Sequence, residues 1–147
     1  MELNVDRELI EHMMEPKNYG SMSKPDSEGI GKNPANGEKV VIYLVVDKGA
    51  NVPKIRDIRY QAIGCSTTIV AGSMLTEEAK GLDFVEVESL IVATQKVLES
   101  VPPEDAVCTQ MVILALQAAM QTYEKRQESA DYPAITLYVE NNCTTVL

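Results

Sequence analysis

The stretch from residue 61 to residue 71 constrains the fold most, because a strand pattern ends and a helix pattern begins within it. Apolar and aromatic residues run up to Gly64, as in a strand, and apolar residues then recur at helical spacing. The thiol of Cys65 therefore lies at a strand-to-helix junction, followed by Ser66 and Thr67, either of which can cap the helix. A helix N-terminus favours the thiolate, the form that binds metal or carries sulfur. The alternative is a small, buried structural cysteine.

The remaining chain predicts an α+β domain. The first predicted elements are a short helix capped by Asp6 and ended by Pro16, a loop over 17–38, and antiparallel strands at 40–46 and 54–63. Three helical segments follow: a helix from Cys65 to Lys80 that stops at Gly81, a short helix capped by Asp83 and Glu86, and a stretch over 89–99 that buries Leu90, Ala93, Val97 and Leu98. The last elements are a long helix from Pro102-Pro103 to Arg126 and a half-buried strand at 135–139. The first helix carries an apolar stripe, and the long helix carries a longer one. These stripes are Leu9, Ile10, Met13 and Met14, and then Met111, Val112, Ala115, Leu116, Ala119 and Tyr123.

Composition excludes several classes of function. A formal net charge of −9 and the lack of tryptophan argue against nucleic acid, which needs clustered cations and stacking side chains. We expect no membrane span and no signal peptide, since the sequence has no apolar run of the required length and a charged start. Three widely spaced cysteines indicate reduced thiols and a cytoplasmic protein.

A second cysteine lies on the buried face of the long helix. Cys108 precedes Met111 and Val112 by about one turn, near the start of that helix. Because Cys65 and Cys108 both lie near helix starts, we expect them to share one site, with their sulfurs within about 7 Å, as two zinc–sulfur bonds require. The single histidine, His12, is interpreted as a surface or packing residue rather than a ligand.

Several stretches occur in the order that they have in one family of proteins. They are Glu11 to Gly20 (EHMMEPKNYG), Asn33 to Glu38 (NPANGE), Tyr60 to Ser66 (YQAIGCS), Ala79-Lys80-Gly81, Val101-Pro102-Pro103, and Cys108 on the long helix. From about Leu9 to Gln127 the chain resembles the IscU/NifU-like iron–sulfur cluster assembly scaffolds. The resemblance implies a small antiparallel sheet packed against several helices over residues 1–128. Residues 129–147 are a C-terminal extension, for which the alternation at 135–139 predicts an extra strand.

The resemblance also implies a function. Such a scaffold is a carrier and not an enzyme; it binds iron or zinc, receives sulfur from a cysteine desulfurase, holds a transient 2Fe-2S cluster and passes it to recipient apoproteins. The extra strand offers an edge through which two copies could pair.

This chain departs from the family at several ligand positions. Cys65 and Cys108 stand where the second and third family cysteines fall, while the first cysteine is Asn36, the aspartate is Glu38 and the histidine is Val107. The resemblance thus assigns the site to Cys65, Cys108 and Glu38. Candidates for the missing ligand are Asn36, Glu104, Asp105, Cys143 or a partner chain.

The chain also departs from the family at its chaperone-binding motif, and two other functions stay open. The chaperone-binding motif Leu-Pro-Pro-Val-Lys reads Val101-Pro102-Pro103-Glu104-Asp105, and its reversed charge argues against the chaperone contact. The protein could instead be a metal-free binding or regulatory module that keeps the fold, or a zinc-bearing sulfur-transfer partner of a desulfurase. For the scaffold, we expect the loop over 17–38 to become ordered only with metal or partner.

Overall fold

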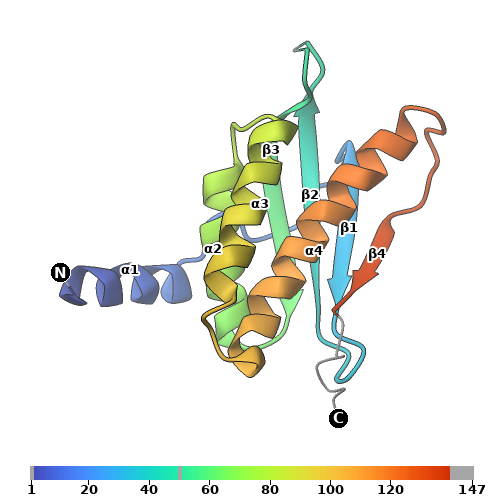
Figure 1. Cartoon of the computed structure of the whole chain (residues 1–147). Coiled ribbons are helices and arrows are strands. Elements are labelled where there is room, and N and C mark those ends of the chain that lie inside the picture. Colours follow the sequence, from blue (N-terminus) through green and yellow to red (C-terminus); the bar gives the residue numbers. More distant parts are fainter. Residues whose placement is uncertain (1, 50, 140–147) are drawn as a thin grey trace.

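A mixed four-stranded sheet with helices on one face forms the body of the protein (Figure 1). The computed structural model describes residues 2–49 and 51–139. The elements, in order, are α1 (Glu2–Met14), β1 (Ser27–Lys32), β2 (Lys39–Asp47), β3 (Lys54–Ile63), α2 (Ser66–Ala79), α3 (Phe84–Leu98), α4 (Pro103–Arg126) and β4 (Ile135–Tyr138). The α+β fold predicted from the sequence is confirmed.

The sheet has the strand order β3-β2-β1-β4. β2 pairs antiparallel with both β1 and β3, as expected for consecutive strands. The predicted C-terminal strand is present as β4, but it pairs parallel with β1, so the sheet is mixed and not wholly antiparallel.

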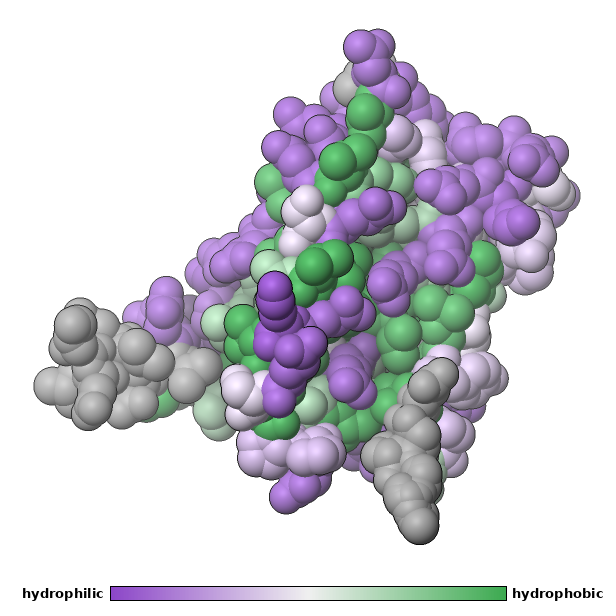
Figure 2. Space-filling model, viewed as in Figure 1, coloured by the Kyte–Doolittle hydropathy of each residue, from purple (hydrophilic) through white to green (hydrophobic). Residues whose placement is uncertain are grey.

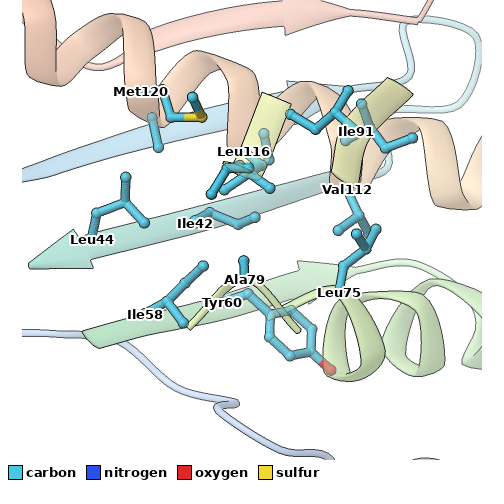
Figure 3. Close-up of a cluster of buried hydrophobic side chains, with 14 of the residues drawn as sticks. Ile42, Leu44, Ile58, Tyr60, Leu75, Ala79, Ile91, Val112, Leu116 and Met120 are labelled. Carbon is cyan, nitrogen blue, oxygen red and sulfur yellow. The ribbon is translucent and has the colours of Figure 1, made fainter. Parts of the chain in front are cut away.

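The hydrophobic core lies between the sheet and helices α2, α3 and α4 (Figure 3). Alternate residues of β2 point inward and are fully buried, which explains its β-branched run. The stripe predicted for α4 faces this layer, and Met111, Val112 and Leu116 are almost completely buried. Burial of this apolar surface is the main force that holds α4 across the sheet.

The prediction of a loop over residues 17–38 is wrong for β1. Residues 27–32 form a strand between β2 and β4, and the residues that face α4 include Gly29 and Gly31. A Cβ at either glycine would overlap the α4 backbone, so α4 crosses β1 at a distance that only glycine permits. The glycines thus serve close helix–strand packing. The expectation that residues 17–38 become ordered only with metal or partner stays a prediction.

The first helix also differs from the prediction. It begins before Asp6, which therefore lies inside the helix and does not cap it. Ile10, Met13 and Met14 are 53%, 50% and 76% exposed, so the predicted stripe does not face the core. Instead His12 is buried, and α1 extends from the body beside α2 (Figure 1).

Residues 84–98 form one helix, where the sequence predicts two. The capping box of Asp83 and Glu86 is present as predicted, but the helix it opens continues to Leu98. Its buried side chains are Phe84, Val87 and Ile91. The predicted burial of Ala93 and Val97 is wrong, because the helix presents these residues to solvent. Figure 2 shows apolar groups among the hydrophilic surface on this side of the molecule.

Candidate functional site

Cys65 connects the end of β3 to the start of α2. Its backbone is extended (φ −82°, ψ 176°), and its carbonyl oxygen accepts hydrogen bonds from the N–H groups of Thr68 and Ile69 at 3.1 and 3.3 Å. Cys65 is therefore itself the N-cap residue of α2. The predicted side-chain caps, Ser66 and Thr67, lie inside the helix, and no side chain caps it. The N–H groups of the first turn, which have no partner within the helix, can therefore donate hydrogen bonds to the Cys65 sulfur.

The structure brings Cys65 and Cys108 together. Their Sγ atoms are 3.3 Å apart, and both cysteines are free thiols. This confirms the expected short distance between the sulfurs. Cys108 is the sixth residue of α4, past the first turn in which the sequence places it, and it is only 7% exposed. The pair thus combines an exposed thiol with a buried one.

The surroundings of Cys65 favour its thiolate. Desolvation by burial opposes ionisation, but several hydrogen bonds outweigh it: from the backbone N–H of Thr68, the Cys108 thiol, the Thr68 hydroxyl and the backbone N–H of Thr67. Together they lower the pKa of Cys65 to about 7. A substantial fraction of Cys65 is therefore ionised near neutral pH, as a metal ligand or a sulfur acceptor requires.

The pKa of Cys108 is raised. Burial is the largest cause, and the hydrogen bond and charge of Cys65 and the charge of Glu38 act in the same direction, against a lowering by the Thr68 hydroxyl. Two thiols this close cannot both ionise easily without a cation. Ionisation of Cys65 therefore opposes ionisation of Cys108, and a bound metal would favour the thiolate form of both.

Thr68 is a residue of this site that the sequence analysis missed. Its side chain is fully buried, its Oγ1 lies 3.8 Å from Cys65 Sγ, and its hydroxyl also acts on Cys108. A Cβ at Gly64 would lie 3.0 Å from the same Oγ1, so the glycine leaves room for it. Its spacing could have identified it, because the third residue after the N-cap of a helix lies beside that N-cap.

Glu38 and Asn36 lie in the turn that joins β1 to β2. The turn is closed by hydrogen bonds from Gly37 N–H to Asn33 O and from Asn33 N–H to Glu38 O, each at 2.8 Å, and Gly37 has a positive φ of 79°. The negative charge of Glu38 contributes to the raised pKa of Cys108. The Asn36 side chain is exposed, and its Oδ1 accepts the Glu38 N–H at 3.0 Å, so this oxygen is already engaged.

The other predicted candidates are less closely tied to the pair. Glu104 and Asp105 are exposed in the first turn of α4, and Val107 is half-buried. Cys143 lies outside the described residues. Within the part of the chain that the structure describes, no group of three histidine, cysteine or carboxylate side chains is arranged to hold a metal. Two soft sulfur donors suit zinc or iron, but they supply only half of a tetrahedral ligand set.

His12 belongs to a separate polar cluster. Its Nδ1 lies 2.5 Å from Ser73 Oγ, its Nε2 lies 3.7 Å from Glu77 Oε1, and Lys17 N–H donates to the same Ser73 oxygen at 2.7 Å. Ser73 is eight residues along α2 from Cys65, about 12 Å at the helical rise. The interpretation of His12 as a packing residue agrees with this position.

Comparison with known proteins identifies the family of this chain. Residues 5–130 match the model of the family described as the NifU-like N terminal domain. The chain belongs to this family. The match spans most of α1, strands β1 to β3, the cysteine pair and all of α4, and it ends before β4.

Curated relatives of this NifU-like chain include two prokaryotic scaffolds. It is 29% identical over 124 residues to "Iron-sulfur cluster assembly scaffold protein IscU 1" of Archaeoglobus fulgidus, covering 84% of this chain and 78% of the relative. It is 29% identical over 130 residues to the scaffold protein IscU of Aquifex aeolicus, covering 86% and 80%. These names describe scaffolds, in agreement with the prediction of a scaffold rather than an enzyme.

Solved structures share the fold. The N-terminal NifU-like protein of Brucella abortus superposes with a TM-score of 0.66 at 16% identity, covering 82% of this chain and 94% of that one. A scaffold protein assigned to the SUF system, from Fervidobacterium islandicum, gives 0.63 at 16% identity, covering 77% and 93%. Among the described residues, no helix combines the length and apolar character that crossing a membrane requires.

Proposed function

We propose that this NifU-like protein is an iron–sulfur cluster assembly scaffold whose cargo is built on Cys65 and Cys108. The observation that carries the proposal is the 3.3 Å separation of the two sulfurs, with one thiol exposed and its pKa lowered to about 7. A purely structural cysteine gains nothing from an exposed position at a helix N-terminus. The names of the curated relatives support the same function.

Cys65 is the residue that accepts sulfur in this proposal. A desulfurase carries its sulfur as a persulfide, and the Cys65 thiolate attacks the terminal sulfur of that group. The sulfur–sulfur bond of the donor breaks, a persulfide forms on Cys65, and the donor cysteine leaves as a thiolate, so the transfer needs no outside oxidant or reductant. The exposure of Cys65 allows this attack, whereas the buried Cys108 is a ligand only.

The pair also suits iron and zinc. Both metals take thiolate ligands, and a cation between the sulfurs would offset the burial and the repulsion from Cys65 that raise the pKa of Cys108. Glu38 adds a carboxylate whose charge already acts on this site. The finished 2Fe-2S cluster or metal is cargo for recipient apoproteins in the cytoplasm.

The experiment is to measure iron, zinc and acid-labile sulfide in protein purified without oxygen and supplied with a desulfurase and iron. We expect the wild type to carry metal and sulfide. Cys65→Ser and Cys108→Ser should carry neither at wild-type level, because serine is a poor ligand for soft metals. Ser66→Ala, beside Cys65 and exposed, is the matched control and should load normally.

The same experiment separates the alternatives. Wild-type protein without metal or sulfide would favour the metal-free binding module. Stable zinc, with no sulfide retained in the presence of desulfurase and iron, would favour a zinc-bearing sulfur-transfer partner. Circular dichroism of each variant shows whether a loss of loading reflects a loss of folding.

A further inference from the structure

We propose that Cys108 releases the sulfur accepted by Cys65 as sulfide, by attacking the Cys65 sulfur and closing a Cys65–Cys108 disulfide. The inference rests on the proposed function, because it begins with the persulfide on Cys65. It gives Cys108 a second role, which follows sulfur acceptance and goes beyond that of a ligand. The observations that carry it are the contact between the two sulfurs and the difference in their exposure.

The sulfur of a persulfide must be reduced before it can enter a cluster. The outer sulfur of a persulfide is at the oxidation level of elemental sulfur, whereas an iron–sulfur cluster contains sulfide. Two thiols that join in a disulfide give up the two electrons that separate these levels. Cys65 and Cys108 are both free thiols, so the pair can supply this reduction itself.

The two sulfurs are close enough for the reaction. Cys108 Sγ lies 3.3 Å from Cys65 Sγ, within the roughly 3–3.5 Å that reacting atoms occupy before a bond forms. The two cysteines come from the starts of α2 and α4, which lie at the same end of the molecule (Figure 1). Attack therefore needs no movement of either helix away from its position.

The exposure of the two cysteines sets the direction of the reaction. Cys108 is buried and approaches Cys65 from the protein interior, while Cys65 is exposed. In sulfur exchange the attacking and leaving sulfurs lie on opposite sides of the sulfur between them. An attack from the buried side therefore expels sulfide on the side that is open to solvent.

The step is balanced in atoms and electrons. The Cys108 thiol gives up its proton to solvent, and its sulfur bonds to Cys65 Sγ as the bond from Sγ to the outer sulfur breaks. The outer sulfur leaves as hydrosulfide with the proton that it carried. It gains two electrons, and each cysteine sulfur loses one. A dithiol reductant then returns the disulfide to two thiols before the pair binds metal.

Thr68 favours this step through its hydroxyl. Its side chain is fully buried, its Oγ1 lies 3.8 Å from Cys65 Sγ, and the hydroxyl also hydrogen-bonds to Cys108. A hydrogen bond to the Cys108 sulfur stabilises the negative charge that this sulfur carries when it attacks. Because Thr68 cannot move into solvent, it keeps both sulfurs in this arrangement.

The test follows a single turnover in reduced, full-length protein freed of metal with a chelator. A desulfurase and cysteine supply the sulfur, with no thiol reductant present. In the wild type we expect one sulfide released per chain and a disulfide between the Cys65 and Cys108 peptides, as read by mass spectrometry. Cys108→Ser should keep its persulfide on Cys65 and release no sulfide over the same period. Gln110→Ala, exposed on α4, is the matched control and should behave as the wild type.

The outcomes separate this inference from the proposed function. A wild-type persulfide that lasts as long as that of Cys108→Ser would overturn the inference and leave Cys65 as the sulfur acceptor. A disulfide that joins Cys65 to Cys143 or to a second chain would also overturn it, because Cys108 would not be the attacking thiol. Absence of a persulfide on Cys65 in Cys108→Ser, with circular dichroism showing a folded protein, would overturn both.

Discussion

Gly31 of β1 lies directly against Met111 of α4, and a Cβ at residue 31 would overlap the Met111 carbonyl oxygen and lie 2.8 Å from the Ala115 nitrogen. Because Cys108 is about one turn before Met111, this contact also sets the position of the buried thiol. The sheet and the site are thus linked through a residue without a side chain.

Replacing Gly31 by alanine should therefore destabilise the protein. The atoms in the way are backbone, which cannot rotate aside, so α4 must shift, at a cost of about 1–3 kcal/mol or more. Urea unfolding measures the change. Gly49→Ala is the control, because its nearest contact, an Asp47 oxygen, would be at an ordinary 3.5 Å. Equal stability of the two variants would contradict the close packing of α4 on β1.

The same contact explains why part of the fold could not be predicted from the sequence. Residues 27–32 read as a loop because two glycines in six residues suggest a turn, whereas here each glycine admits a helix backbone. The α4 stripe and the strand-to-helix junction at Cys65 were predictable, since local periodicity specifies them. The exposure of Ile10 and Met13 was not, because an apolar stripe does not show whether a partner surface faces it.

The candidate site, like the fold, could be predicted from the sequence only in part. The approach of Cys65 to Cys108 could be predicted from two helices that begin at one end of a sheet. The role of Thr68 could not, because its hydroxyl matters only once both sulfurs converge on it. The hydrogen bond from the Glu38 N–H to Asn36 Oδ1 depends on the conformation of a turn. The sequence predicts where this turn lies but not its conformation.

Alkylation of Cys65 should follow a titration near neutral pH. The thiolate is the reactive form, so the rate of reaction with iodoacetamide should fall as pH drops through about 7, the lowered pKa of Cys65. Cys108, whose pKa is raised, should react only at higher pH. Mass spectrometry of the alkylated peptides separates the two. A midpoint for Cys65 at or above 8.5, about that of a free cysteine, would contradict the hydrogen bonding described at α2.

Thr68→Val should raise the pKa of Cys65. Valine keeps the shape of threonine but removes the hydroxyl, while the backbone N–H of residue 68 still acts on the sulfur. The alkylation profile should therefore move part of the way toward the ordinary thiol value. Thr68→Ser should keep the wild-type profile. Thr67→Val is the matched control, because Thr67 is exposed and only its backbone N–H acts on Cys65.

His12→Ala should loosen α1 from α2. Among the described side chains of α1, His12 is the buried one, and its bond to Ser73 fixes the helix to the body. Amide exchange in residues 7–14 should become faster, with little change for β2. Met14→Ala, at a side chain 76% exposed, should leave exchange unchanged. Unchanged protection of α1 in His12→Ala would show that other contacts hold the helix.

Asn36→Cys should raise metal affinity. The family resemblance places Asn36 at the position of the first scaffold cysteine, in the turn that also carries Glu38, whose charge reaches Cys108. A thiolate here adds a soft, charged donor, although it removes the bond from Asn36 Oδ1 to the Glu38 N–H and so loosens the turn. In Asn36→Cys, a third thiolate should join Cys65 and Cys108 and raise the zinc affinity above that of the wild type, as measured by competition with a chelator. Asn36→Ser disturbs the turn without adding a thiol, and it should not raise the zinc affinity. If the cysteine variant binds zinc no better than this serine control, residue 36 does not reach the sulfur pair.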